Sequence, residues 1–75
     1  MDKREIEAKT CAIMSAYIKK DFGVQDNFVS FVNSLNAVEA QLQIEKTFGI
    51  KISDAEAKGL TSVARIADFV LAKLG

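Results

Sequence analysis

The chain has 75 residues, a length that allows one domain with one thin hydrophobic core. Hydrophobic residues make up 49% and charged residues 27%, a balance typical of a globular domain and not of a disordered tail. Ten lysines and arginines offset ten aspartates and glutamates, so the dense positive charge that favours nucleic acid is missing and we expect no nucleic-acid partner.

Residue types that carry catalysis or bind metals are scarce. The sequence has no His and a single Cys, Cys11, which excludes a Ser-His-Asp triad, a Cys-His dyad and a His- or Cys-rich metal site. One Cys forms no internal disulfide, and no apolar run is long enough for a signal peptide or a membrane span. We therefore expect a cytoplasmic protein without a membrane span, without a metal, and without enzyme activity of its own.

The first element expected along the chain is an amphipathic helix over residues 2–20. Its apolar positions recur at the spacing of one helix face: Ile6, Ile13, Met14 and Tyr17. Lys19 and Lys20 would lie at the negative end of the helix dipole, and Gly23 would follow the helix. Residues 25–33 show no period, so we expect a loop there. Its apolar side chains are expected to fold onto the core: Phe28, Val29, Phe31 and Val32.

The sequence predicts three further helices. The second begins near Ser34 and ends at Phe48, because Gly49 is a typical C-terminal signal. Residues 50–52 are expected to be an extended connector. Residues 53–56 fit a capping box that opens a short helix ended by Gly59. The last helix starts after Thr61 or Ser62, and one of its faces carries Val63, Ile66, Ala67, Val70 and Leu74. The fold class is therefore all-α, a small bundle of three main helices and one short helix.

The second helix carries two apolar faces. One comprises Ala37, Ala40, Ile44 and Phe48, and the nearly opposite one comprises Leu35, Val38 and Leu42. Either both faces are buried, or one packs in the bundle while the other is exposed for a partner. Periodicity leaves both alternatives open.

The run Asn-Ser-Leu-Asn-Ala-Val-Glu at residues 33–39 resembles the Asp-Ser-Leu-x-x-x-Glu segment of acyl carrier proteins. The match continues without a gap to about residue 70, through Phe-Gly-Ile-Lys-Ile, Leu-Thr-Ser-Val and Asp-Phe-Val, and Phe-Gly-Val at residues 22–24 resembles the end of the family's first helix. The resemblance implies one carrier-type domain over residues 1–75, with 4'-phosphopantetheine attached to Ser34 as a phosphodiester and an acyl group carried on its thiol as a thioester. A serine at a helix start agrees with this, because an attached phosphate would lie near unpaired N–H groups.

The resemblance also implies roles for other residues of the second helix. Those expected to bind partner enzymes are Leu35, Val38, Glu39, Leu42 and Glu45. Those expected beside a stored acyl chain are Ala40, Ile44 and Val63. The expected partners are a phosphopantetheinyl transferase, an acyl ligase or acyltransferase, and a ketosynthase or other acyl-processing enzyme of fatty-acid, lipid or polyketide biosynthesis. The carrier itself is expected to be a monomer.

Several features depart from the family pattern. Asn33 replaces the usual Asp, Ser30-Phe31 replaces Leu-Gly, the loop before Ser34 is short, and the net charge is zero. These departures suggest a specialised carrier with its own partners, for which electrostatic steering is weak.

The alternative is a small helical interaction module that never carries an arm. It would dock through the face of Leu35, Val38 and Leu42, and Ser34 would be an ordinary residue at a helix start.

Overall fold

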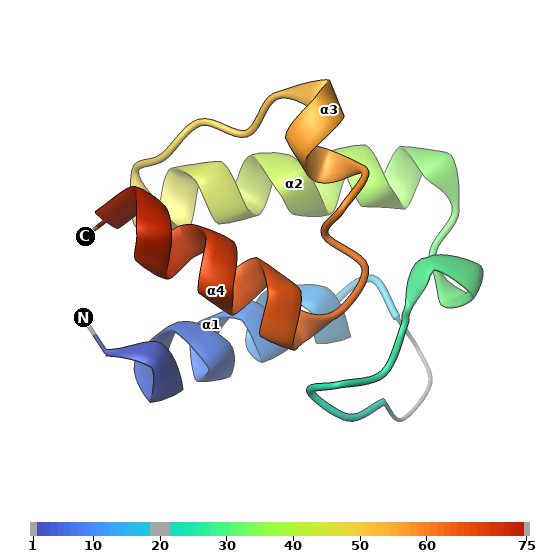
Figure 1. Ribbon diagram of the computed structural model, residues 1–75. Coiled ribbons are helices and arrows are strands. Elements are labelled where there is room, and N and C mark those ends of the chain that lie inside the picture. The colour runs from blue at the N-terminus through green and yellow to red at the C-terminus, as the bar shows by residue number, and fades with distance from the viewer. Residues whose placement is uncertain (1, 19–21, 75) are drawn as a thin grey trace.

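Three helices, α1, α2 and α4, make up most of the molecule, and a fourth, α3, is only one turn long (Figure 1). The computed structural model describes residues 2–18 and 22–74, apart from the side chain of Ser34. The elements are α1 (Lys3–Ser15), the 3-10 helix η1 (Val29–Phe31), α2 (Ser34–Phe48), α3 (Asp54–Ala57) and α4 (Val63–Leu74). Over these residues the structure contains helices and no strands, which confirms the all-α prediction.

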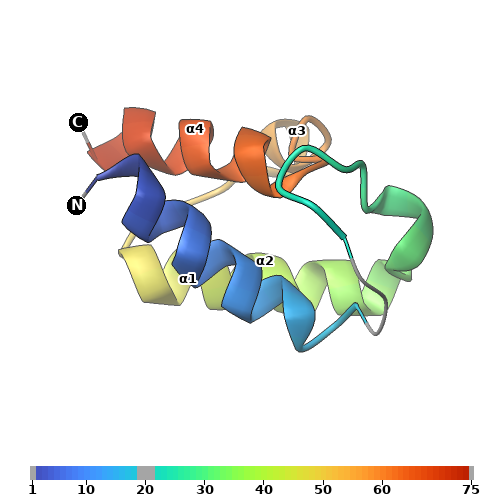
Figure 2. The same ribbon diagram turned by 90° about the horizontal axis from the view of Figure 1, so that it is seen from below.

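The bundle is held by α1, which packs against both α4 and α2 (Figure 2). The buried side chains form one core to which every α-helix except α3 contributes: Ile6, Met14, Ile18, Phe28, Ala40, Ile44, Phe48, Ile52, Val63, Ile66, Ala67 and Val70. Leu74, expected on the inner face of the last helix, is instead 45% exposed. It lies in the final turn of α4, at the end of the bundle, where little of the described chain covers it.

The end of α1 differs from the prediction. The helix starts where the Asp2 side chain accepts the N–H of Glu5 at 2.9 Å, but it ends at Ser15 and does not continue to residue 20. Tyr17 donates to the carbonyl of Met14 at 3.0 Å, a tighter turn than an α-helix makes, and the chain then buries Ile18. Lys19 and Lys20 lie outside the described residues.

The boundaries of α2 are as expected. Asn33 caps its start, and Gly49 ends it in the left-handed conformation with φ 67°. The Gly49 N–H donates to the carbonyl of Glu45 at 2.8 Å, which satisfies one of the carbonyls left free at the helix end.

The loop before α2 is joined by two backbone hydrogen bonds to the start of α4 and to the segment just before it. Phe28 donates to the carbonyl of Thr61, and Ala64 donates to the carbonyl of Val24, each at 2.9 Å. Phe28 is buried and Val32 is half-buried, as predicted.

The other two apolar side chains of this loop do not fold onto the core as expected: Val29 is 55% and Phe31 39% exposed. They belong to the 3-10 turn of η1, whose successive side chains point in different directions around the turn.

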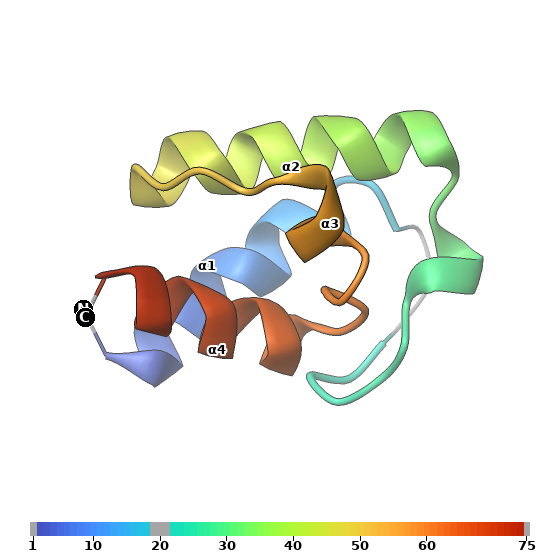
Figure 3. The same cartoon turned by 45° about the horizontal axis from the view of Figure 1, so that its top comes forward.

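α3 lies over one side of α2, between α2 and the start of α4 (Figure 3). Its capping box is formed as predicted: Glu56 N–H donates to Ser53 Oγ at 3.1 Å and Ser53 N–H donates to Glu56 Oε1 at 3.0 Å. The second carboxylate oxygen of Glu56 contacts Lys73 Nζ of α4 at 3.3 Å, which fixes the short helix to the bundle.

Candidate functional site

The start of α2 presents a helix N-terminus. Ser34 is the first helical residue, and Asn33 Oδ1 accepts the N–H of Asn36 at 2.8 Å. The first turn of α2 contains no acidic residue, so no side-chain charge there offsets the positive end of the helix dipole. Such an end suits a phosphate group bound close by. The side chain of Ser34 itself lies outside what the structure describes.

The second apolar face of α2 is exposed. Leu35 is 68%, Val38 55% and Leu42 52% exposed, so the helix packs only its other face in the bundle. Glu39 lies on the same exposed side. Leu42 and Glu39 also border an open hollow of about 630 Å³ that reaches Tyr17 and Ile50. Apolar residues of this kind, rimmed by charged groups, are typical of a surface that binds a protein partner.

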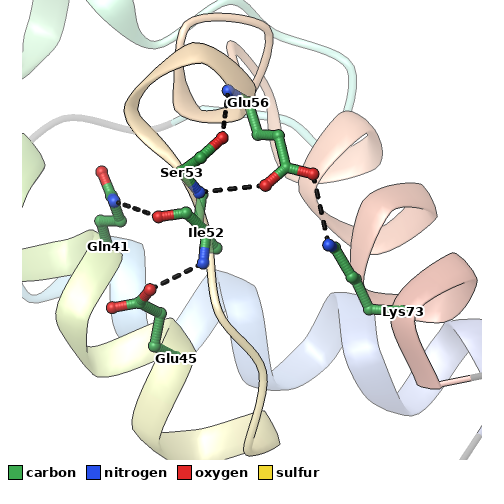
Figure 4. Close-up of polar contacts among 6 residues, drawn as sticks. All are labelled: Gln41, Glu45, Ile52, Ser53, Glu56 and Lys73. Carbon is green, nitrogen blue, oxygen red and sulfur yellow. Dashed lines mark hydrogen bonds and ion pairs between the residues drawn. The ribbon is translucent and has the colours of Figure 1, made fainter.

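Glu45 has a different environment from Glu39. It is half-buried, and its Oε2 accepts the N–H of Ile52 at 2.7 Å (Figure 4). One turn earlier, Gln41 Nε2 donates to the carbonyl of Ile52 at 3.2 Å. The structure therefore gives Glu45 an intramolecular role in addition to the partner contact expected from the sequence. Sequence reasoning missed Gln41, because its bond depends on the path of a connector eleven residues away.

A cavity of about 100 Å³ lies behind the inner face of α2. Its lining comes from all four α-helices and from the three segments that connect them: Met14, Phe28, Val32, Ala37, Ala40, Gln41, Ile44, Ile52, Ala57, Leu60 and Ile66. Ala40 and Ile44, expected beside a stored acyl chain, are among these residues. Val63, expected there too, is fully buried in the core but does not line the cavity; Ile66, one turn later on α4, does.

The cavity adjoins an outer groove of about 470 Å³. The two hollows share five lining residues, Phe28, Val32, Ala37, Ala57 and Leu60, and the groove adds Val29, Lys58 and Thr61. Ala37 lies about one turn after Ser34, and its N–H donates to the carbonyl of Asn33 at 2.9 Å. Both hollows therefore lie beside Ala37, about one turn after the start of α2.

Among the described side chains, no group of three or more His, Cys, Asp or Glu residues is placed to hold a metal ion. In the part of the chain that the structure covers, no helix is long and apolar enough to cross a membrane.

Comparisons with known proteins agree with this geometry. The family described as "Phosphopantetheine attachment site" matches residues 9–70. The acyl carrier protein of Prochlorococcus marinus (strain MIT 9515) is 32% identical over 80 aligned positions that cover 100% of both chains. The solved structure of BlmI, a type-II acyl-carrier-protein from Streptomyces verticillus involved in bleomycin biosynthesis, has a similar fold. Its TM-score is 0.83 at 24% identity, over 97% of this chain and 90% of that one. The chain therefore belongs to the acyl carrier protein family, whose members hold acyl groups on a covalently attached 4'-phosphopantetheine and are carriers, not enzymes.

Proposed function

We propose that Ser34 is the residue to which 4'-phosphopantetheine is attached, and that this chain presents acyl thioesters to partner enzymes through the exposed face of α2. The observation that carries the proposal is the position of Ser34 as the first residue of α2, next to the exposed side chain of Leu35. The matched family segment, residues 9–70, includes this position.

The chemistry asked of this chain is limited. In the transferase complex the Ser34 hydroxyl would form a phosphodiester with the phosphopantetheine of coenzyme A, and adenosine 3',5'-bisphosphate would leave. The arm supplies a thiol that holds the acyl group as a thioester. Because the arm is tethered, the acyl group reaches each docked enzyme at high effective concentration, which is how a chain without catalytic groups serves a reaction sequence.

The proposed partners are a phosphopantetheinyl transferase, an acyl ligase or acyltransferase, and a ketosynthase or similar enzyme. They would contact Leu35, Val38 and Leu42, with Glu39 opposite a basic group of the partner. The net charge of zero supports a carrier with its own partners, since a neutral protein gains little from long-range steering. We further propose that the chain is a single carrier domain that works as a monomer in the cytoplasm.

The decisive experiment is intact-mass measurement after incubation with coenzyme A, Mg²⁺ and a broad-specificity phosphopantetheinyl transferase. We expect a mass increase of one phosphopantetheine in the unmodified sequence and none in Ser34→Ala. The matched control is Ser30→Ala, which removes another serine, four residues earlier, and should still gain the full mass.

Two outcomes would contradict the proposal. One is a mass increase that survives Ser34→Ala, which would place the attachment elsewhere. The other is a folded protein that gains no mass with this transferase and carries no arm when purified from its native host. That second outcome would favour the interaction module that docks without an arm.

A further inference from the structure

We propose that the partner enzyme of this carrier presents acidic side chains to Lys46 and Lys51, at the end of the exposed face of α2 that lies away from Ser34. Closer to Ser34, the same partner presents a basic group to Glu39, as proposed above. The partner is thus recognised by two charges of opposite sign. This inference rests on the proposed function, because it concerns the enzymes that would receive acyl groups from the arm at Ser34.

The spacing of residues along α2 is the first observation. One series of exposed side chains follows intervals of four, three and four residues: Leu35, Glu39, Leu42 and Lys46. Residues three and four apart are neighbours on a helix surface, so these side chains share one face. Lys46 therefore continues the face that Leu35 begins. A partner that covers Leu42 also contacts the ammonium group of Lys46.

The second observation is that Lys51 joins this face from outside the helix. α2 ends at Phe48, and Gly49 turns the chain into the connector that contains Lys51. Lys51 borders the same open hollow as Lys46 and Leu42. Both lysines are exposed. Two positive charges are thereby gathered at one end of the face.

The charges of this end are available to a partner. Among the described residues, no ion pair involves Lys46 or Lys51. The acidic residue next to Lys46 is Glu45, but it is half-buried and its Oε2 accepts the N–H of Ile52 at 2.7 Å, so its carboxylate is turned to the connector (Figure 4). Glu39, the other acidic residue of the hollow, is exposed and lies about two turns before Lys46.

This arrangement selects a partner by charge. A partner with a carboxylate opposite Lys46 gains an attractive contact, whereas one with Lys or Arg there brings like charges together, which opposes docking. Lys46 lies twelve residues after Ser34, which corresponds to about 18 Å along the helix axis. The acidic group of the partner is therefore expected about 18 Å from the point where the arm enters its active site.

Lys46 has a second possible role, which Lys51 does not share. Lys46 lies in the last turn of α2, where a positive charge complements the helix dipole and stabilises the carrier itself. Lys51 lies beyond the helix, in the connector. Variants of both lysines are needed to separate docking from stability.

The test measures acyl transfer to two forms of one ketosynthase. The first form is an enzyme chosen because its carrier-docking surface is basic. In the second form, the basic residues of that surface farthest from the active-site entrance are replaced by Glu. Equal reaction of both forms with acyl-pantetheine shows that the replacement leaves the active site intact. The carrier is loaded by the transferase, loading is verified by intact mass, and the rate of transfer to the ketosynthase cysteine is measured at low carrier concentration.

Lys46→Glu and Lys51→Glu should each speed transfer to the basic form and slow transfer to the acidic form, each by about fivefold, the size of effect that one exposed charge pair gives. Both effects should shrink at about 1 M salt, where the screening length is about 3 Å. Lys9→Glu is the matched control: it changes the net charge equally but lies on α1, outside the hollow, and should leave the ratio of the two rates unchanged.

Each outcome supports or overturns the proposal. A role of Lys46 in stability alone would change both rates in the same direction and leave Lys51→Glu without effect. If neither reversal changes the rates with the two ketosynthase forms, or if Lys9→Glu changes their ratio as much, the charge-based recognition is overturned while the carrier function stands. If intact mass shows that no arm is attached, or that the arm survives Ser34→Ala, the proposed function fails at the loading step, before any docking is compared, and the inference falls with it.

Discussion

Asn33 is the residue whose chemistry most affects the start of α2. Its side-chain oxygen accepts the N–H of Asn36 at 2.8 Å, and its backbone carbonyl accepts the N–H of Ala37 at 2.9 Å. An aspartate, the residue usual here in the family, would cap the helix equally well and add a negative charge next to its positive end. With asparagine the cap is kept and the charge is absent.

This gives a prediction for the stability of the apo protein. Asn33→Ala should lower the free energy of unfolding by about 1 kcal/mol, because α2 loses its cap. Asn33→Asp should preserve or slightly raise it, since a carboxylate both caps and complements the dipole. Urea unfolding followed by circular dichroism measures the difference. The control is Asn36→Ala, which keeps the backbone N–H that the Asn33 side chain accepts, so we expect little change in its free energy of unfolding. If Asn33→Ala were as stable as the unmodified sequence, the cap would contribute nothing.

The residues at the ends of α2 and at the start of α3 were the most predictable part of the molecule. Asn33, Gly49 and Ser53 act on backbone groups within four residues, so their roles follow from local sequence alone. The bonds of Gln41 and Glu45 to Ile52 were not predictable in this way. They span eleven and seven residues, and they exist only because the connector runs back along α2.

Among the elements, α3 depends most on its side chains. A helix of four residues is too short to be stable alone, because nucleation costs more than so few hydrogen bonds return. The capping box of Ser53 and Glu56 and the contact of Glu56 with Lys73 compensate for this. The Glu56 carboxylate thus takes part in both of the interactions that keep α3 in place.

The stability supplied by Glu56 should depend on pH. The pKa of Glu56 is lowered from its ordinary value of 4.5. The largest cause is the hydrogen bond with the Ser53 backbone N–H, and smaller contributions come from the Ser53 hydroxyl and then from Lys73. A group whose pKa is lowered by folding stabilises the folded state above its ordinary pKa, and this contribution is lost as the pH falls through the lower value. The melting temperature of Glu56→Gln should therefore lie below that of the unmodified sequence at neutral pH and approach it in acid.

Lys73→Ala provides the control for this experiment. Because Ser53 is the main cause of the lowered pKa, this variant should keep most of the pH dependence while losing the contact to α4. A constant difference between Glu56→Gln and the unmodified sequence at every pH would contradict the assignment.

The helix that sequence reasoning misjudged is α1. Its apolar period continues to Tyr17, and periodicity alone carries the helix on to residue 20. The structure ends it at Ser15, after which the N–H groups of Ala16 and Tyr17 donate to carbonyls three residues back, and Ile18 remains buried. Periodicity does not show where the hydrogen-bond pattern changes, and it could not decide which face of α2 is buried. Only the arrangement of α1 and α4 shows that Leu35, Val38 and Leu42 are left outside.

At the scale of the whole molecule, the segment between α1 and α2 contributes Phe28 to the core. Phe28 is 6% exposed, lines the cavity, and is bonded through its backbone to Thr61. A domain of this size has little stability to spare, because it buries only a modest share of its surface. One aromatic residue of the loop thus contributes to the packing beside the inner face of α2.

Phe28→Ala should accordingly lower the free energy of unfolding by about 3–5 kcal/mol, the cost of removing a buried aromatic side chain. Val29→Ala, a change at the next residue where the side chain is 55% exposed, should stay within about 0.5 kcal/mol of the unmodified sequence. Urea unfolding of both variants measures the contrast. Similar losses for the two would mean that the loop does not pack as described.

The start of α1 and the end of α4 lie side by side, and Lys3 Nζ contacts Asp68 of α4 at 2.8 Å (Figure 1). The start of α2 is at the opposite end of a molecule whose longest dimension is 30 Å (Figures 1 and 2). Any tether joined at either end of the described chain, whether an affinity tag, a resin or a fused domain, would therefore hold the protein by the pole away from Ser34. Immobilised in this way, the carrier would keep the start of α2 and its apolar face open to whichever enzyme is passed over it.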